Sequence, residues 1–252
     1  MSPRRSGPDA GVTRSRQTVL AIPGLVCDGL VFERLADALA DLAEVVVADL
    51  APYDDLTAMA WAALAEVAGP VHVVGHSLGG RVALEIWREA PERVLSLVLM
   101  DTGVHGVRPG EAEVRQEMLD TTARGGMAAL ADAWLPQMVG PSRRDDAAVM
   151  APLRAMVMRA TPEQYVRQVR ALLTRPDATD LLATIDVPTL LVVGRHDAWS
   201  PPEQHAEMVA AIPGARLEIV EDAGHFVTVE QPAVVTALLR DWFERRTPPA
   251  VA

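Results

Sequence analysis

The segment with the clearest chemical signal is 75–79, which reads Gly-His-Ser-Leu-Gly and places Ser77 between two glycines. An apolar run at 71–74 leads into it, and a helical pattern continues from it to residue 89. A serine on a tight turn from a strand into a helix is lifted above the sheet edge, and the helix N-terminus adds partial positive charge beside it. This context predicts that Ser77 is a nucleophile.

A serine hydroxyl needs a base, and the chain has six histidines that could provide one. His225 lies at 222–226, a predicted loop between the last strand and the last helix, from which a base can reach the carboxyl edge of the sheet. His76 is adjacent to Ser77, and the turn directs its side chain away. His205 lies in a helical pattern and is predicted to face solvent. We therefore predict that His225 is the base.

The base needs an acid to orient it. Asp197 follows the predicted strand 188–193 and precedes a helix, which places it at the same sheet edge. Asp101 ends another predicted strand and is a rival for this role. Asp222 is close to His225 in sequence and could instead be a local partner within the loop. Asp197 is the predicted orienting acid.

Ester chemistry also needs two backbone N–H groups that stabilise the developing oxyanion. The residue after the nucleophile, Leu78, provides one predicted donor. The loop after the first strand, 23–28, should provide the second, and the amide of Leu25 is the predicted group. Cys27 lies in the same loop, where it either borders the pocket or is a small buried apolar residue.

Short β-rich runs alternate with longer helical patterns along most of the chain. Continuous apolar runs such as 190–193 are what strands of a parallel sheet covered on both faces require. The alternation predicts an α/β fold with a doubly wound, mostly parallel sheet. The predicted strands are 19–23, 45–48, 71–74, 94–100, 188–193 and 216–220, and the predicted helices are 29–40, 56–68, 79–89, 202–211 and 230–245.

This alternation stops between 103 and 185, where only helical patterns occur. A helical block inserted after the strand that ends near Met100 predicts a cap over the edge of the sheet where ligands bind. The block holds six of the ten methionines, which either fill the packing against the body or line an apolar pocket. Ten arginines and ten acidic residues at 103–184 make it neutral, which favours a neutral, apolar substrate.

Composition excludes several function classes. The 252 residues are 50% hydrophobic and carry a formal charge of -11, which disfavours nucleic-acid binding. All 23 basic residues are arginines, so lysine chemistry such as Schiff-base formation is excluded. One cysteine allows no internal disulfide, and no apolar run is long enough for a transmembrane helix. Residues 1–16 are predicted to be a flexible tail, and the protein is expected to be cytoplasmic, as a monomer or homodimer without membrane contact.

Together these motifs resemble the α/β-hydrolase superfamily, specifically its small capped esterase-like members. The resemblance covers roughly 18–245 and depends on the segments 23–24, 75–80, 194–197 and 224–225. It implies an α/β-hydrolase fold whose nucleophile, acid and histidine follow in the order Ser77, Asp197, His225. It also implies a core at 17–102 and 186–252 with a helical cap at 103–185.

The sequence departs from this family pattern at two places. Pro23-Gly24 stands where the family usually has His-Gly, which alters how the loop of Leu25 is braced. Only about 17 residues precede the first predicted strand, and they lack the strand pattern with which many members begin. We therefore expect a sheet of about six strands.

The function expected from these residues is that of a serine carboxylesterase, which hydrolyses a small, largely apolar ester through an acyl-enzyme without metal or organic cofactor. A lactonase, a thioesterase, a cofactor-free perhydrolase or a carbon–carbon bond hydrolase would use the same residues. A rival of another class is a non-catalytic ligand receptor on the same fold.

Overall fold

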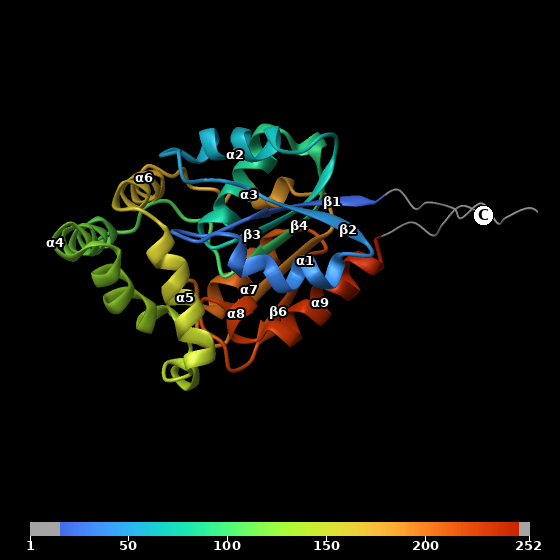
Figure 1. The fold of residues 1–252 in the computed structure, drawn as a ribbon. Helices are drawn as coiled ribbons and strands as arrows, with labels where there is room; N and C mark the ends of the chain where they lie inside the picture. Colours follow the sequence, from blue (N-terminus) through green and yellow to red (C-terminus); the bar gives the residue numbers. More distant parts are fainter. Residues whose placement is uncertain (1–15, 247–252) are drawn as a thin grey trace, which may run out of the picture.

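The computed structural model describes residues 16–246, and a six-stranded parallel sheet forms its centre (Figure 1). The strand order is β2-β1-β3-β4-β5-β6, and every neighbouring pair is parallel. The strands are β1 (Gln17–Ile22), β2 (Ala43–Val47), β3 (Val71–His76), β4 (Val94–Met100), β5 (Thr189–Gly194) and β6 (Arg216–Val220).

Helices cover both faces of the sheet. Helices α1 and α9 pack against each other on one face, and α2 and α3 pack against each other on the opposite face (Figure 1). This arrangement explains why β3 and β5 are buried along their whole length, since helices shield both faces of the sheet from water. The body helices are α1 (Glu33–Leu39), α2 (Leu56–Ala65), α3 (Leu78–Glu89), α7 (Pro202–Ala211), α8 (Val227–Glu230) and α9 (Pro232–Glu244).

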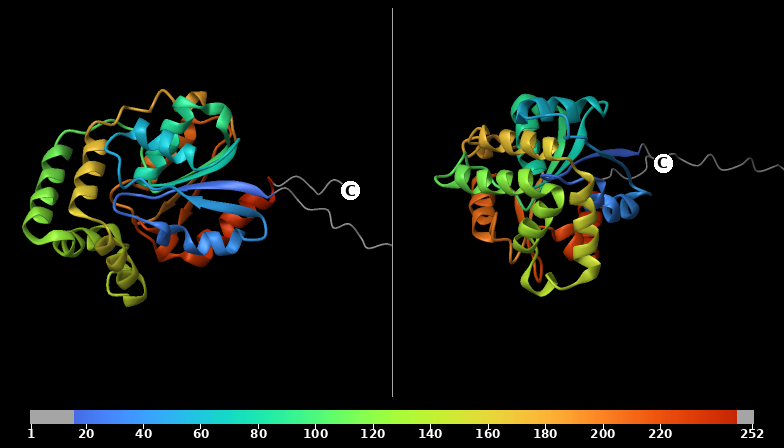
Figure 2. Two further views of the ribbon diagram at one scale, coloured as in Figure 1. Left: turned by 45° about the horizontal axis from the view of Figure 1, so that its top comes forward. Right: turned by 60° about the vertical axis from the view of Figure 1, so that its left-hand side comes forward.

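Three further helices lie between β4 and β5 in sequence. They are α4 (Glu111–Met138), α5 (Ala147–Arg159) and α6 (Pro162–Leu173), and they stand off the carboxyl edge of the sheet (Figure 2). Helix α4 packs on both α5 and α6. It is kinked at Gly126, whose φ of 67° and ψ of -165° are not helical. We call residues 103–185 the helical segment.

The predicted fold class is confirmed. The sheet has six parallel strands, and the strands Val94–Met100 and Arg216–Val220 have the predicted bounds. The predicted helix 29–40 is divided into a 3-10 turn, Gly29–Phe32, followed by α1. The predicted tail, 1–16, lies outside the described residues except for Arg16. Within the described part of the chain, no helix is both long and apolar enough to cross a membrane.

The contact between β1 and α3 is close enough to require a glycine. A Cβ atom added at Gly79 would lie 1.9 Å from the carbonyl oxygen of Ile22, at the end of β1. Real side chains do not approach a backbone atom this closely, so any larger residue would push α3 away from the sheet. The glycine therefore sets the depth at which α3 packs.

We expect Gly79→Ala to lower the free energy of unfolding by about 2–3 kcal/mol, because the sheet and helix must separate to admit the methyl group. Urea unfolding measures this. The matched control is Gly29→Ala, where the added Cβ would have no atom within 4 Å in the described chain beyond its own neighbours along the backbone. Equal unfolding midpoints for the two variants would contradict the close contact.

Candidate active site

Ser77 occupies the turn between β3 and α3, and its backbone is strained. Its φ of 55° and ψ of -114° lie outside the regions that non-glycine residues usually adopt. The amide of Ser77 donates to the carbonyl of Met100 over 2.9 Å, which ties the turn to the end of β4. A Cβ at Gly75 would lie 2.4 Å from the carbonyl oxygen of Gly79, so the turn closes only between glycines. These contacts hold the strained serine above the sheet edge.

His225 lies on the loop between β6 and α8, and its ring reaches Ser77. The Nε2 atom of His225 is 2.8 Å from the Oγ of Ser77, and Nδ1 is 2.8 Å from Oδ2 of Asp197. The amide of His225 donates to the carbonyl of Met138 at the end of α4. The structure therefore brings Ser77, His225 and Asp197 into one chain of hydrogen bonds at the carboxyl edge of the sheet.

Asp197 is buried and strongly hydrogen-bonded. It accepts from the amides of Trp199 and Ser200 and from the hydroxyl of Ser200. Burial raises the pKa of Asp197, but the charge and hydrogen bond of His225 and the bonds from Ser200 outweigh it and lower that pKa to about 2. Asp197 is therefore ionised at neutral pH. The proton on this side of the imidazole then sits on Nδ1, which leaves Nε2 as an acceptor for the Ser77 hydroxyl.

The two rival acids occupy other places. Asp101 accepts from the amides of Gly194 and Val227, and it makes no hydrogen bond to the ring of His225 within the described residues. Burial and the nearby charge of Asp197 raise the pKa of Asp101 well above its ordinary range. Asp222 is exposed and contacts Ser142 and Arg143 of the helical segment. Only Asp197 of these three carboxylates lies on the Nδ1 side of His225.

The loop after β1 lies directly beside the serine. A Cβ at Gly24 would be 3.1 Å from the Cβ of Ser77, and both Leu25 and Leu78 line the cavity above it. Neither amide of these two leucines has an acceptor within the described residues, so both are free to bind an oxyanion. Cys27 is buried in the same loop and does not line this cavity.

The cavity above Ser77 has a volume of about 490 Å³ and lies between the sheet edge and the helical segment. Apolar side chains form much of its wall, including Met118, Trp134, Met138, Tyr165 and Leu172. Two of the six methionines of the helical segment, Met118 and Met138, therefore face the cavity. The volume is that of a site for a small organic molecule.

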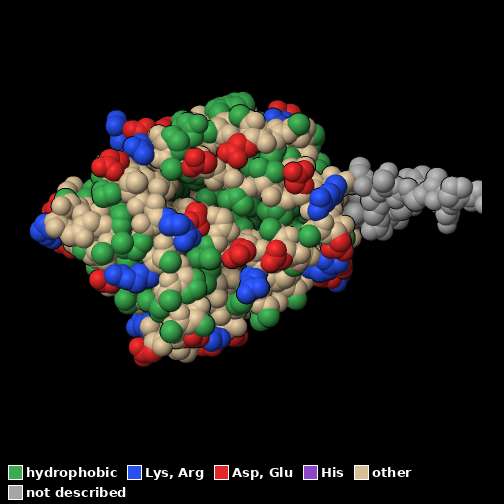
Figure 3. Space-filling model, viewed as in Figure 1, with side chains coloured by type: hydrophobic (Ala, Val, Ile, Leu, Met, Phe, Trp, Pro, Cys, Tyr) green, Lys and Arg blue, Asp and Glu red, His purple; other side chains and the backbone are tan. Residues whose placement is uncertain are grey.

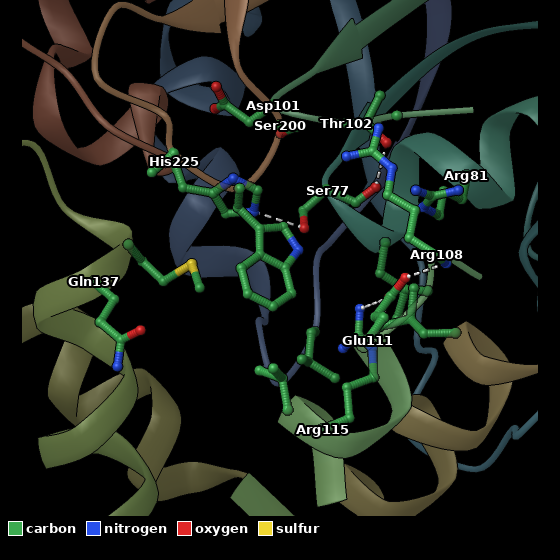
Figure 4. Close-up of a pocket in the computed structure, with 18 of the residues that line it drawn as sticks. Ser77, Arg81, Asp101, Thr102, Arg108, Glu111, Arg115, Gln137, Ser200 and His225 are labelled. Atoms are coloured by element: carbon green, nitrogen blue, oxygen red, sulfur yellow. Dashed lines mark hydrogen bonds and ion pairs between the residues drawn. The ribbon is translucent and has the colours of Figure 1, made fainter. Parts of the chain in front are cut away.

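Polar groups gather on one side of this cavity. Figure 4 shows Arg81, Arg108 and Glu111 on one side of Ser77, with Gln137 on the other. The equal numbers of arginines and acidic residues in the helical segment did not predict this group of charged side chains. Arg81 belongs to α3 in the body, and it lies on the same side of the cavity as Arg108 only in the folded chain. The sequence offered no local signal for either arginine.

The structure gives two other residues, His205 and Glu230, surroundings that the sequence did not predict. His205 was predicted to face solvent, which is wrong: it is fully buried, and its Nε2 accepts from the amide of Thr102. Glu230 had no predicted role. It is buried and accepts from the amides of Gly140, Gly224 and Phe226 over 2.7, 2.9 and 3.0 Å. It thereby joins the helical segment to the loop that carries the histidine.

Within the described residues, no group of three or more His, Cys, Asp or Glu side chains is arranged to hold a metal ion. The groups around the cavity that can act on a substrate are the hydroxyl of Ser77, the imidazole of His225, the carboxylate of Asp197, the free amides and the arginines. Such a set can attack a carbonyl carbon and stabilise the oxyanion that forms.

Known proteins share this architecture. Residues 19–238 match the model of the alpha/beta hydrolase family. The pimeloyl-[acyl-carrier protein] methyl ester esterase of Neisseria meningitidis serogroup B is 30% identical over 208 residues, which cover 75% of each chain. A thermophilic esterase from Thermogutta terrifontis superposes with a TM-score of 0.83 at 29% identity, over 92% of this chain and 91% of that chain.

The enol-lactonase of Burkholderia xenovorans LB400 shares the fold at 22% identity, with a TM-score of 0.81 over 91% of this chain and 92% of that chain. The match to the family model spans most of the chain, including the strands and loops that carry Ser77, Asp197 and His225. The chain therefore belongs to the alpha/beta hydrolase family.

Proposed function

We propose that this hydrolase is a serine carboxylesterase that acts on a small, largely apolar ester. The observation that carries the proposal is the hydrogen-bonded chain from Ser77 Oγ to His225 Nε2 and from His225 Nδ1 to Asp197, with both distances 2.8 Å. These distances are within the reach that proton transfer requires. The similarity of the chain to the two esterases named above also supports an esterase function.

The reaction would proceed in two halves. His225 takes the proton from Ser77 as the serine oxygen attacks the ester carbonyl, and the amides of Leu78 and Leu25 hold the oxyanion. Asp197 keeps the imidazole in the required tautomer and stabilises its charged form. His225 then protonates the leaving alcohol. In the second half it activates water, which releases the acid and restores the serine.

The helical segment would serve as the cap of this site. In this proposal the core comprises 17–102 and 186–252, and the cap comprises 103–185. The apolar cavity wall supplied by α4 and α6 supports a substrate whose body is apolar. The hydrogen bond from the His225 amide to Met138 ties the cap to the base-carrying loop, so the cap and the proposed chemistry are physically linked.

A lactonase would use the same groups, and the enol-lactonase named above has the same fold. A lactone differs from an open ester only in that the leaving alcohol stays attached to the acyl group. A panel of esters, lactones, acyl thioesters and diketones, assayed with and without peroxide, would separate these activities. Faster turnover of lactones than of esters of equal size would favour the lactonase.

Ser77→Ala should lower kcat for 4-nitrophenyl butyrate by about 10⁴-fold or more, because no other hydroxyl or thiol of residues 16–246 is hydrogen-bonded to the His225 ring. Thermal unfolding provides the control, since the side chain makes no other hydrogen bond within the described residues and the fold should persist. Substantial residual turnover in the folded variant would exclude Ser77 as the nucleophile. Absence of turnover in the wild type across the whole panel would instead favour a non-catalytic receptor.

Asp197→Asn should lower kcat by about 10⁴-fold, because an amide leaves the imidazole in the wrong tautomer. Asp101→Asn is the matched control, since this residue is equally buried and near the same loops but makes no hydrogen bond to His225. Its main expected effect is a loss of stability of about 1–3 kcal/mol. If Asp101→Asn lost more kcat than Asp197→Asn, the acid would be misassigned.

The lowered pKa of Asp197 also predicts a pH dependence of stability. Its folded pKa of about 2 lies below the ordinary value of 3.8, so the unfolded chain binds the proton more readily. The contribution of Asp197 is therefore complete above about pH 5 and is lost as pH falls from about 4 towards 2. Relative to Asp197→Asn, the wild type should lose roughly 2 kcal/mol over this range in urea unfolding. Parallel pH profiles for the two proteins would contradict this.

A further inference from the structure

The cavity above Ser77 is rich in positive charge, although the whole chain carries a net charge of -11. Four arginines and one glutamate line it: Arg81, Arg108, Arg115, Arg175 and Glu111. Asp101 also borders the cavity, but its two carboxyl oxygens accept the backbone amides of Gly194 and Val227, and within the described residues it pairs with none of these arginines. Acidic and basic side chains are interspersed on the face of the molecule seen in Figure 3, so that face shows no extended patch of one sign of charge.

Arg175 and Arg115 already form hydrogen bonds and ion pairs with other groups of the chain. All five donors of Arg175 are used, by both carboxylate oxygens of Glu111 and by the carbonyls of His105, Gly106 and Leu172. Arg115 also pairs with Glu111 and lies over the ring of Trp199. Both cations are therefore already paired with Glu111, although its single negative charge balances only one of them.

Among residues 16–246, the side chains of Arg81 and Arg108 do not pair with a carboxylate. The side chain of Arg81 makes one hydrogen bond, from Nη1 to the carbonyl of His105, and that of Arg108 makes one, from Nη2 to Oε1 of Gln204. Both acceptors are neutral. Within residues 16–246, no carboxylate oxygen lies within 4 Å of either guanidinium, and most of their donors remain unused.

The surroundings of Arg81 favour an anion. Burial, together with the neighbouring charge of Arg175, lowers the pKa of Arg81 to about 9. Such a depression indicates a cation that has lost water without gaining a full counter-charge. An anion bound beside it would be stabilised by Arg81 and would in turn relieve the repulsion between the arginines.

The two arginines lie where a substrate of Ser77 would meet them. Arg81 is one helical turn along α3 from Ser77, and its amide donates to the carbonyl of that serine. Figure 4 shows Arg81 and Arg108 on the same side of the nucleophile. Gln137 lies on the opposite side, on the last turns of α4, which also supply Trp134 and Met138 to the apolar wall.

We propose that the substrate carries a carboxylate in addition to its ester group, and that Arg81 and Arg108 bind this carboxylate while the ester carbonyl lies at Ser77. The proposal builds on the esterase function proposed above and narrows its substrate class to half-esters of dicarboxylic acids and acyl esters of hydroxy acids. Two guanidinium groups offer paired N–H donors that match the two oxygens of a carboxylate. The apolar wall then holds the uncharged remainder of the molecule.

Matched substrates test this directly. Monomethyl glutarate and monomethyl adipate are compared with methyl pentanoate and methyl hexanoate, which place the same number of carbons on the acyl side without the charge. In a further pair the carboxylate lies on the alcohol side: 4-acetoxybutanoate is compared with butyl acetate, which has the same number of carbons without the charge. Acid release in a pH-stat gives kcat/KM for each substrate. The wild type should prefer the charged member of at least one pair by about tenfold or more.

Arg108→Gln and Arg81→Gln should each reduce this selectivity ratio by about tenfold, because each removes one charged partner of the carboxylate. The control is Arg124→Gln, which removes an exposed arginine from α4 at a position that does not line the cavity. It should leave the ratio unchanged. Arg81 is half-buried, so thermal unfolding accompanies the assay, and the exposed Arg108 provides the variant that is expected to fold in any case.

A binding measurement separates this proposal from the esterase function. Ser77→Ala is titrated with monomethyl glutarate and with methyl pentanoate, and binding is followed by calorimetry. Tighter binding of the charged ester, lost in the Ser77→Ala, Arg108→Gln double variant, would support the carboxylate site even if the wild type hydrolysed neither ester. Hydrolysis of both esters that depends on Ser77, with no preference for charge and no difference in binding, would overturn the carboxylate site and leave the esterase function in place.

Discussion

The structure depends on one tight backbone turn, in which β3 ends and α3 begins with almost no space between them. A Cβ atom on Gly75 would lie 2.4 Å from the carbonyl oxygen of Gly79, and one on Gly79 would lie 1.9 Å from the carbonyl oxygen of Ile22 at the end of β1. The strain falls on Ser77, whose positive φ of 55° puts its hydroxyl above the sheet edge. Strain of this kind costs about 1–3 kcal/mol and persists only where surrounding packing maintains it. The buried parallel strands on both sides supply that packing.

Three buried carboxylates hold the loops around this turn. Asp101 joins the end of β5 to the start of α8 through two backbone amides. Asp197 accepts from the amides of Trp199 and Ser200, which follow it in the same turn, and its hydrogen bond to Nδ1 orients the ring of His225. Glu230 joins the loop of His225 to the helical segment through three amides. A buried carboxylate is costly unless it is hydrogen-bonded, so each is stable only while the loops keep their relative positions. The geometry of the proposed base thus depends on acids that do not touch it as well as on Asp197.

Electrostatics divides the cavity into two parts. On one side, Glu111 pairs with both Arg115 and Arg175, while the side chains of Arg81 and Arg108 are hydrogen-bonded only to neutral groups among residues 16–246. On the other side, the end of α4 presents apolar and aromatic side chains. A charged substrate group is stabilised most where water is already excluded and cations are already oriented, since no reorganisation is then needed on binding. The neutral overall charge of the helical segment does not describe the cavity, because it includes residues that do not line the cavity and leaves out Arg81 of α3.

The sequence by itself determined the fold class and the family, because both are encoded in local patterns: continuous apolar strands, helical periodicity and a glycine-flanked serine. Those patterns also placed Ser77, Asp197 and His225 at strand ends, which meet at one edge in a parallel sheet. Only the tertiary structure decided which acid contacts His225 and that His205 is buried. Only the tertiary structure places Arg81 and Arg108 beside the same cavity. It also brings three backbone amides within hydrogen-bond distance of Glu230. These features join residues distant in the chain, and their charges and donors find partners only when separate elements pack, so no local pattern could predict them.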